Sequence, residues 1–377
     1  MAIAKKIISL SVAVALTGSC LFGCADTDFA AKTENTTISV GQYIYHVFDN
    51  LMKAEEELEV TPSSSDSNFF ELTIDDQNVE DWIVNNAKKD LKACVGASIE
   101  FENLGLTLTE EEKTKTTTTD EEGNDVSISI SDYYDNLDDY YHLSDLGISK
   151  QSLTAVLNSE KKYEKVFDSY YGAGGSQEVP SQEISDYIKT NGASYKMMTV
   201  AKRGSTSTET TDASSPTTLT ATDESKAEAQ GYVDQINGGK SIDDVYHDYE
   251  YANGTTDDTF VPLEVEFVFK EDTTSTLEDN VLSALFEQAQ TDGPAILIEG
   301  DYSFYIIQRY SVSDETVSQN KDQALEYMKD DEFSEIMCQM ADTKGYQENE
   351  SAFKEYTPKA LYKRYEKYSE DSMVTYY

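Results

Sequence analysis

Acidic side chains outnumber basic ones by more than two to one, and this excess limits what the chain can fold into. The 377 residues include 72 aspartates and glutamates but only 29 lysines and arginines, a formal net charge of −43. The apolar fraction of 38% includes 26 tyrosines. The aliphatic content is therefore lean, and the hydrophobic cores should be modest, helical and divided among domains. An aromatic fraction of 11% argues against a disordered acidic chain, and the shortage of basic residues excludes a nucleic-acid-binding protein.

The N-terminal residues have the pattern of an export signal. Two lysines precede an apolar run from Ile7 to Leu16, which has the length of a signal-peptide core and is too short to span a bilayer. The sequence Leu-Phe-Gly-Cys that ends at Cys24 resembles a bacterial lipobox. We therefore predict a lipoprotein signal peptide over residues 1–23, lipidation of Cys24 and a tether over residues 24–30.

This signal predicts that the working part of the protein lies outside the cytoplasm. Two acyl chains on Cys24 would anchor it to the outer face of the bacterial cytoplasmic membrane. No later window offers 18 continuous apolar residues for a spanning helix. The alternative is an ordinary secretory signal, in which Cys20 and Cys24 are incidental thiols.

Apolar residues recur at helical spacing through most of residues 31–193. After a short extended piece, the pattern predicts four helices, over residues 40–58, 79–104, 132–143 and 150–171. Alternating residues near 113–131 predict a surface hairpin inserted between the second and third of these helices. Residues 31–193 are therefore predicted to form a helical domain.

Short strands mixed with helices replace this pattern in the next part of the chain. Residues 194–312 are predicted to follow the order β-α-α-β-α-β-β, with a loop rich in serine and threonine at residues 203–222. Residues 313–377 are again helical but polar, so they need a partner, and the N-terminal helical domain is the candidate. The predicted fold class is α+β.

Cysteines and histidines give little support for a metal or redox site. Cys94 and Cys338 fall in two predicted helices without Cys-x-x-Cys spacing, and we favour two separate buried thiols over a disulfide between them. His46, His142 and His247 are scattered along the chain. We predict no metal and no other cofactor.

Four stretches of the sequence resemble those of one family of secreted proteins. They are Ile38-Ser-Val-Gly-Gln-Tyr-Ile-Tyr-His, Leu104-Gly-Leu-Thr-Leu-Thr-Glu-Glu-Glu, Leu146-Gly-Ile-Ser-Lys-Gln-Ser-Leu and Val179-Pro-Ser-Gln-Glu-Ile-Ser-Asp-Tyr. In this order, behind a lipobox, they resemble the extracytoplasmic foldases of the SurA and PrsA type.

The resemblance implies both a fold and a function. The fold is a mostly helical SurA-N-like chaperone domain, built from N-terminal helices and a returning C-terminal helix, together with a parvulin-like peptidyl-prolyl isomerase domain of the PpiC type. Helix 322–344 would then pack on helix 79–104. The implied function is that of a membrane-anchored chaperone or foldase, and the implied partners are unfolded or nascent secreted polypeptides.

The resemblance also identifies a departure at the isomerase site. Parvulin-type sites usually have two facing strand histidines on their polar floor, and these positions align with Lys196 and Tyr305. The catalytic site is therefore predicted to be degenerate, and we assign no catalytic residue. A groove lined by Met198, Phe286 and Tyr305 is the candidate peptide-binding site.

Two other functions remain open from the sequence. One is an active peptidyl-prolyl cis-trans isomerase, so the sequence leaves open whether the protein is an enzyme. The other is a surface binding lipoprotein, either a solute receptor or an adhesin. A solute receptor usually needs two α/β lobes with longer repeating βα units than the sequence shows.

Overall fold

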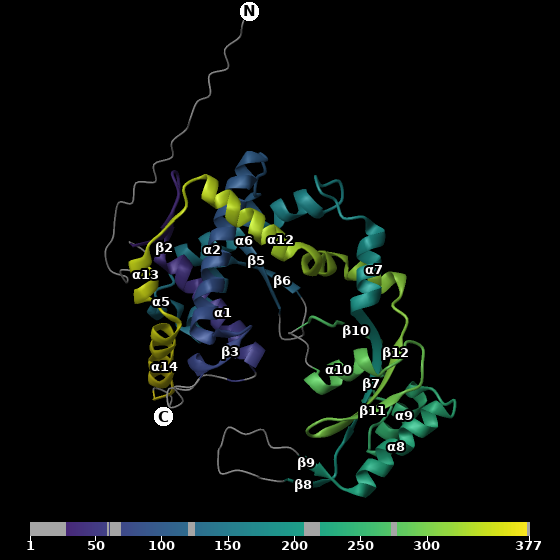
Figure 1. The fold of residues 1–377 in the computed structure, drawn as a ribbon. Helices are drawn as coiled ribbons and strands as arrows, with labels where there is room; N and C mark the ends of the chain where they lie inside the picture. The colour runs from purple at the N-terminus through teal and green to yellow at the C-terminus, as the bar shows by residue number, and fades with distance from the viewer. Residues whose placement is uncertain are drawn as a thin grey trace, which may run out of the picture.

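A computed structural model describes residues 28–58, 60, 69–119, 125–206, 219–272 and 277–374 (Figure 1). The predicted signal peptide, Cys24 and most of the serine- and threonine-rich loop lie outside the described residues. Strand β1 (Phe29–Lys32) is the first regular element of the described chain. Among the described residues, no helix is both long and apolar enough to cross a bilayer.

Four long helices form the helical part. The apolar stripe of α1 (Val40–Leu58) is buried because its residues recur every three to four positions. It contacts α2 (Val79–Asn103), which also contacts α6 (Lys150–Tyr171) and α12 (Lys321–Thr343). The docking of α12 on α2 is therefore present as the resemblance implied.

Two strands near the N-terminus and one strand from the C-terminal segment form one small sheet. Strand β1 lies between β2 (Thr37–Ser39) and β13 (Gln347–Glu348), and both pairs are antiparallel. The Asn349 side-chain amide also donates to the Phe29 carbonyl over 2.7 Å. Strand β13 follows α12 within the segment 313–377 that was expected to be helical, and the chain then continues as α13 (Glu350–Glu355) and α14 (Pro358–Val374).

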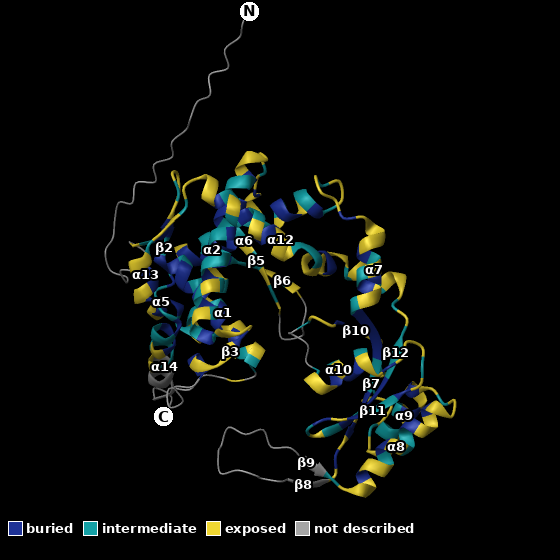
Figure 2. Cartoon of the chain, viewed as in Figure 1, coloured by how far each residue is buried: buried dark blue, intermediate teal, exposed yellow. Residues whose placement is uncertain are grey.

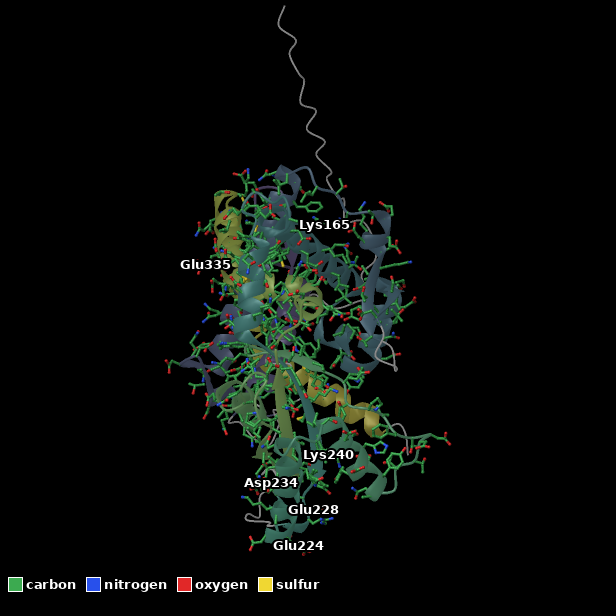
Figure 3. The ribbon with its side chains drawn as sticks, turned by 90° about the vertical axis from the view of Figure 1, so that its right-hand side faces the viewer. Lys165, Glu224, Glu228, Asp234, Lys240 and Glu335 are labelled. Carbon is green, nitrogen blue, oxygen red and sulfur yellow. The ribbon has the colours of Figure 1, made fainter. Side chains whose placement is uncertain are left out.

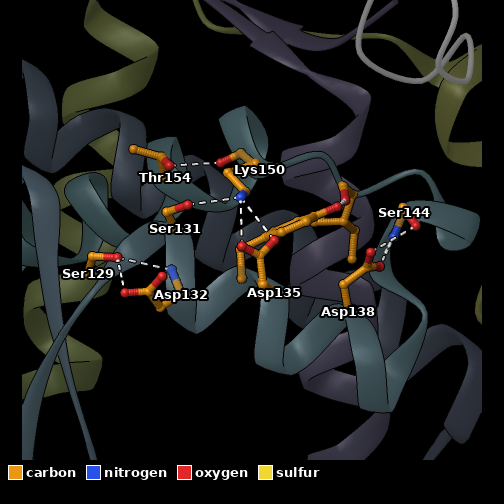
Figure 4. Close-up of polar contacts among 10 residues, drawn as sticks. Ser129, Ser131, Asp132, Asp135, Asp138, Ser144, Lys150 and Thr154 are labelled. Carbon is orange, nitrogen blue, oxygen red and sulfur yellow. Dashed lines mark hydrogen bonds and ion pairs between the residues drawn. The ribbon is translucent and has the colours of Figure 1, made fainter.

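The connections between the long helices are short, locally stabilised elements. In Figure 4, Ser129 accepts a hydrogen bond from the Asp132 amide and caps α4. The Lys150 ammonium bridges Asp135 and Ser131 at 2.9 Å each, which joins α4 to the start of α6. These connecting elements are η2 (Phe69–Glu71), β3 (Thr73–Ile74), β4 (Gln77–Asn78), α3 (Glu110–Thr114), β5 (Lys115–Thr119), β6 (Asp125–Ser129), α4 (Ile130–Tyr141) and α5 (Leu143–Leu146).

The second part of the molecule is a four-stranded antiparallel sheet with helices on both faces, in the spatial order β10-β7-β12-β11. Apart from a small hairpin in the serine- and threonine-rich loop, the chain order is β-α-α-β-α-β-β, so the predicted α+β class and element order are confirmed. The elements are β7 (Gly192–Ala201), β8 (Gly204–Thr206), β9 (Leu219–Ala221), α8 (Asp223–Asn237), α9 (Ile242–Ala252), β10 (Glu266–Phe269), α10 (Asp279–Glu287), β11 (Ile296–Glu299) and β12 (Ser303–Tyr310).

A shared hydrophobic core joins the two parts. The helices α7 (Ser181–Asn191) and α11 (Asp314–Gln319) connect the sheet to the helical part, and α12 runs beside them (Figure 1). Residues of α2, α6, α7, β10 and α12 belong to one buried cluster around Phe333. Figure 2 shows this buried interior continuing from the helices into the sheet. The sheet is therefore fixed to the helical part by packing.

The carboxyl group of Glu160 makes the stability of the helical part depend on pH. Burial, and then the charges of Asp49 and Glu164, raise its pKa from 4.5 to about 7, although Lys53 and Lys161 oppose the shift. The folded protein therefore binds this proton more tightly than the unfolded chain. The free energy of unfolding should fall as the pH rises from 4.5 through 7, because the stabilisation exists only while the group is protonated.

Replacement of Glu160 by glutamine should remove this pH dependence. We expect E160Q to be more stable than the native protein by ~2 kcal/mol at pH 8 and nearly equal at pH 4.5. Urea denaturation at both pH values measures the difference. The exposed Glu335, on α12, provides the control variant E335Q, which should show no such pH-dependent gain. Equal effects of both variants would contradict the assignment.

Candidate functional site

The two faces of the sheet are covered by different helices. Because side chains alternate along a strand, Met198 and Ile306 face α8 and α9, whereas Ile307 faces α10. We call the second side the α10 face. It is the face that carries Tyr305 and Phe286 among its partly buried residues.

Tyr305 is held at the α10 face by a carboxylate. Its hydroxyl donates to Glu278 Oε1 over 2.7 Å, and the other oxygen of Glu278 accepts from the Asp301 amide over 3.0 Å. Gly300 lies against both the Glu278 carboxylate and the Tyr305 ring. A Cβ at this position would overlap both groups. Burial, and then Glu278, raise the pKa of Tyr305 to about 12, so its hydroxyl is a donor at neutral pH.

Lys196 does not lie on the same face as Tyr305, which corrects the predicted alignment of the two family histidines. Its ammonium contacts Asp243 of α9 at 2.7 Å. The residue of β7 that faces α10 is the preceding one, Tyr195. Neighbouring side chains of a strand point to opposite faces, so Tyr195 and Lys196 must face opposite sides of the sheet. The alternation of apolar residues along β7 indicates this difference.

Tyr195 has the same chemical arrangement as Tyr305. Its hydroxyl donates to Glu266 Oε2 over 2.6 Å, and burial followed by this hydrogen bond raises its pKa. Two tyrosine–glutamate pairs therefore occupy the polar positions of the α10 face.

Met198 cannot line a groove with Phe286 and Tyr305. Its side chain is 0% exposed and lies in the core formed with α8 and α9, on the other side of the sheet. The residue that packs with Phe286 and Tyr305 is Met197. The predicted groove of Met198, Phe286 and Tyr305 is therefore not present: Met197, Phe286 and Tyr305 are half-buried around the core of the α10 face, to which the buried Tyr195 belongs.

An arginine completes the α10 face. The Arg309 guanidinium lies 5.3 Å from the centre of the Phe286 ring. It donates to the backbone carbonyls of Leu285 and Gly192 over 3.4 and 3.3 Å. It fixes the orientation of Phe286 relative to the strands.

The chain has no histidine at this site. Of its three histidines, His247 stacks on Tyr251 of α9, His142 follows α4, and His46 lies in α1. Cys94 and Cys338, considered above for a disulfide, are both free thiols, and burial raises the pKa of each. Among the described residues, no group of histidine, cysteine and acidic side chains is arranged to hold a metal ion.

A peptide assay tests the prediction that the isomerase site is degenerate. The barrier to rotation about the peptide bond is about 18–20 kcal/mol, and a degenerate site should leave it unchanged. We expect the chain from Ala25 to Tyr377 to leave the cis-to-trans rate of a short Xaa-Pro peptide at its uncatalysed value. Acceleration that is lost in the double variant Y195F/Y305F would contradict this expectation.

The chain thus combines two parts. One is a sheet domain with the element order implied for a parvulin-like domain and no histidine on its α10 face, and the other is a helical domain in which α12 packs on the N-terminal helices. No model of a protein family matches the chain, and no curated protein matches it.

Several solved structures of PrsA proteins are similar to this chain. The foldase PrsA of Lactococcus lactis is 12% identical, with a TM-score of 0.33, over 90% of this chain and 99% of that one. The PrsA of Streptococcus pneumoniae is 9% identical, with a TM-score of 0.35, over 86% and 97%. The PrsA of Bacillus subtilis is 13% identical, with a TM-score of 0.27, over 88% and 98%. At these identities and TM-scores the similarity assigns no function and no residue role to this chain.

Proposed function

We propose that this protein is a membrane-anchored extracytoplasmic chaperone that binds unfolded secreted polypeptides without isomerising proline. The observation that carries the proposal is the α10 face. It has apolar and aromatic residues, Met197, Phe286 and Tyr305, and its polar groups are tyrosine–glutamate pairs rather than histidines. Such a face can contact peptide side chains but has no group suited to twisting an amide.

Tyrosine-rich contact surfaces suit this function. Tyrosine offers a large, rigid and amphipathic contact area at a low cost in conformational entropy. The strongly acidic surface, with a formal charge of −43, would keep the protein itself soluble while it holds an aggregation-prone partner.

Aggregation of an unfolded secreted protein tests the proposal. We expect the chain from Ala25 to Tyr377 to reduce light scattering by a diluted, unfolded secreted protein when present in several-fold excess. F286A should suppress aggregation less well, because it removes an aromatic wall. V261A is the matched control, since Val261 is an exposed apolar residue in the segment before β10. No suppression by the native chain would remove the proposal.

The lipid anchor is a separate part of the proposal. In a bacterial host that processes lipoproteins, the native protein should be recovered in the membrane fraction after export. C24S cannot carry the thioether-linked lipid, so it should be released in soluble form or remain uncleaved. C20S is the matched control and should stay with the membrane. Retention of cleaved C24S at the membrane would contradict lipidation at Cys24.

A further inference from the structure

Three hollows lie end to end along α6. The first, of about 370 Å³, is bounded by the β1–β2 connection, α1, α2 and α6. The second, of about 310 Å³, shares His46 and Cys94 with the first. The third, of about 530 Å³, lies between α6 and α12 and shares Tyr163, Glu164 and Asp330 with the second. We call the three together the α6 groove.

The groove has the length of a short peptide. Its α6 lining runs from Ala155 to Asp168, which corresponds to roughly 20 Å at 1.5 Å per residue. An extended polypeptide rises about 3.3 Å per residue. The groove therefore matches a segment of about six residues.

One end of the groove is strongly acidic. The second hollow is lined by five carboxylates, Asp49, Asp90, Glu160, Glu164 and Asp330, with one lysine among them. The third hollow adds four carboxylates and no lysine. Burial, and then neighbouring carboxylates, raise the pKa of Glu326 in the third hollow. A cation bound among these groups would relieve their mutual repulsion.

A buried histidine gives an independent indication of a ligand. His46 is only 4% exposed and lines both the first and the second hollow. Its ring makes an edge contact with Tyr45 but no hydrogen bond to any residue that the structure describes. A buried polar group without a partner is costly. Since burial lowers the pKa of His46, the neutral ring can accept a hydrogen bond.

The first hollow contains a second buried polar atom that lacks a hydrogen-bond partner among the described residues. The Asn158 side-chain oxygen is buried and has no hydrogen-bond partner among the described residues. Acceptors at His46 and Asn158 suit the N–H groups of a polypeptide backbone. The aromatic rings of Tyr163, Phe167 and Tyr327 in the third hollow suit the methylene stem of a lysine or arginine side chain.

We propose that the α6 groove binds an extended polypeptide segment that carries lysine or arginine. The backbone of the segment lies against His46 and Asn158, and its cationic side chain lies among the carboxylates between α6 and α12. This inference rests on the proposed function and specifies which segments of an unfolded polypeptide the helical part selects.

Labelled peptides test this selection. Two fluorescein-labelled seven-residue peptides are compared, one with two lysines and one with glutamines in their place, by fluorescence anisotropy with the whole chain that follows Cys24. We expect the lysine peptide to bind at least about tenfold more tightly, since hydrogen bonds between ionised groups are roughly twice as strong as those between neutral ones. Its affinity should also fall as salt is added. Equal affinity of the two peptides would overturn the proposal.

Variants of equal charge locate the site. E164Q/D330N removes two carboxylates that each line two hollows, and we expect it to weaken binding of the lysine peptide about tenfold. E335Q/D234N removes the same charge from α12 and α8 outside the groove, at positions labelled in Figure 3, and should bind like the native chain. E326Q changes one exposed carboxyl of the third hollow, so it should weaken binding about twofold without disturbing the core. Equal loss in the groove and control variants would overturn the site.

The experiments distinguish a failure of the groove proposal from a failure of the proposed chaperone function. If the native chain suppresses aggregation but E164Q/D330N binds the lysine peptide as tightly as the native chain, the groove proposal is overturned and the chaperone function stands. If the native chain neither suppresses aggregation nor binds either peptide, both are overturned.

Discussion

Replacement of Gly96 by alanine should detach α12 from α2. The two helices approach closely at Gly96, because a Cβ there would overlap the backbone carbonyl oxygen of Met337. A backbone atom cannot move aside as a flexible side chain can. We expect G96A to lower the free energy of unfolding by ~3 kcal/mol or more and the melting temperature by roughly 10 °C, as measured by circular dichroism.

A second glycine provides the matched control for this prediction. Gly231 lies inside α8, and an added Cβ there meets nothing within 4 Å. Because alanine favours a helix over glycine by about 0.5–1 kcal/mol, G231A should be slightly more stable than the native protein. Similar losses in G96A and G231A would show that close helix packing is not the cause.

Truncation of Phe333 should have the largest effect in the core that joins the two parts. Its side chain is fully buried, and its ring lies 4.7 Å from that of Tyr163, 5.2 Å from Phe167 and 5.7 Å from Tyr170, measured between ring centres. F333A should lower the free energy of unfolding by ~3–5 kcal/mol, because it leaves a cavity and removes several aromatic contacts. Chemical denaturation measures this loss.

Two further variants serve as controls for the loss of stability expected in F333A. F333L keeps most of the volume, so it should lose less than F333A. Y140A removes an aromatic ring that is 71% exposed and should change stability by less than ~0.5 kcal/mol. A loss in Y140A as large as that in F333A would contradict the view that the joint depends on this buried cluster.

Elements with a strong local pattern could be predicted from the sequence. The bounds predicted for the helices 40–58 and 150–171 agree with α1 and α6, because apolar spacing and the glycine stop at Gly172 mark them locally. The hairpin β5–β6 was also predicted, from the alternation in residues 126–131. The domain boundaries proposed from the sequence stay predictions.

Features that depend on distant partners could not be predicted. Strand β13 has two residues, and it forms only because β1, more than 300 residues earlier, offers its edge. The α6 groove draws its lining from four helices and a strand connection, none of which carries a motif of its own. Lys196 and Tyr305 were expected to face each other, but they lie on opposite faces of the sheet, and only the contacts with α9 and α10 show this.

The acidic residues are not distributed evenly over the folded protein. Part of it gathers in the α6 groove, where Glu164 and Asp330 each line two hollows, while Glu224 and Asp234 are spread along α8 at the far end of the molecule (Figure 3). The same charge can therefore repel an anionic membrane surface within about 8 Å at physiological salt and attract basic segments of a partner.

Refolding of a secreted protein with a slow, proline-limited phase tests most directly whether the protein binds without isomerising. Yield and rate are read from one fluorescence trace, with and without the chain from Ala25 to Tyr377. Binding without catalysis predicts a higher yield of folded protein and an unchanged rate constant for the slow phase, which lies in the range of ~10–100 s. A faster slow phase, or a yield no higher than without the chain, would contradict it.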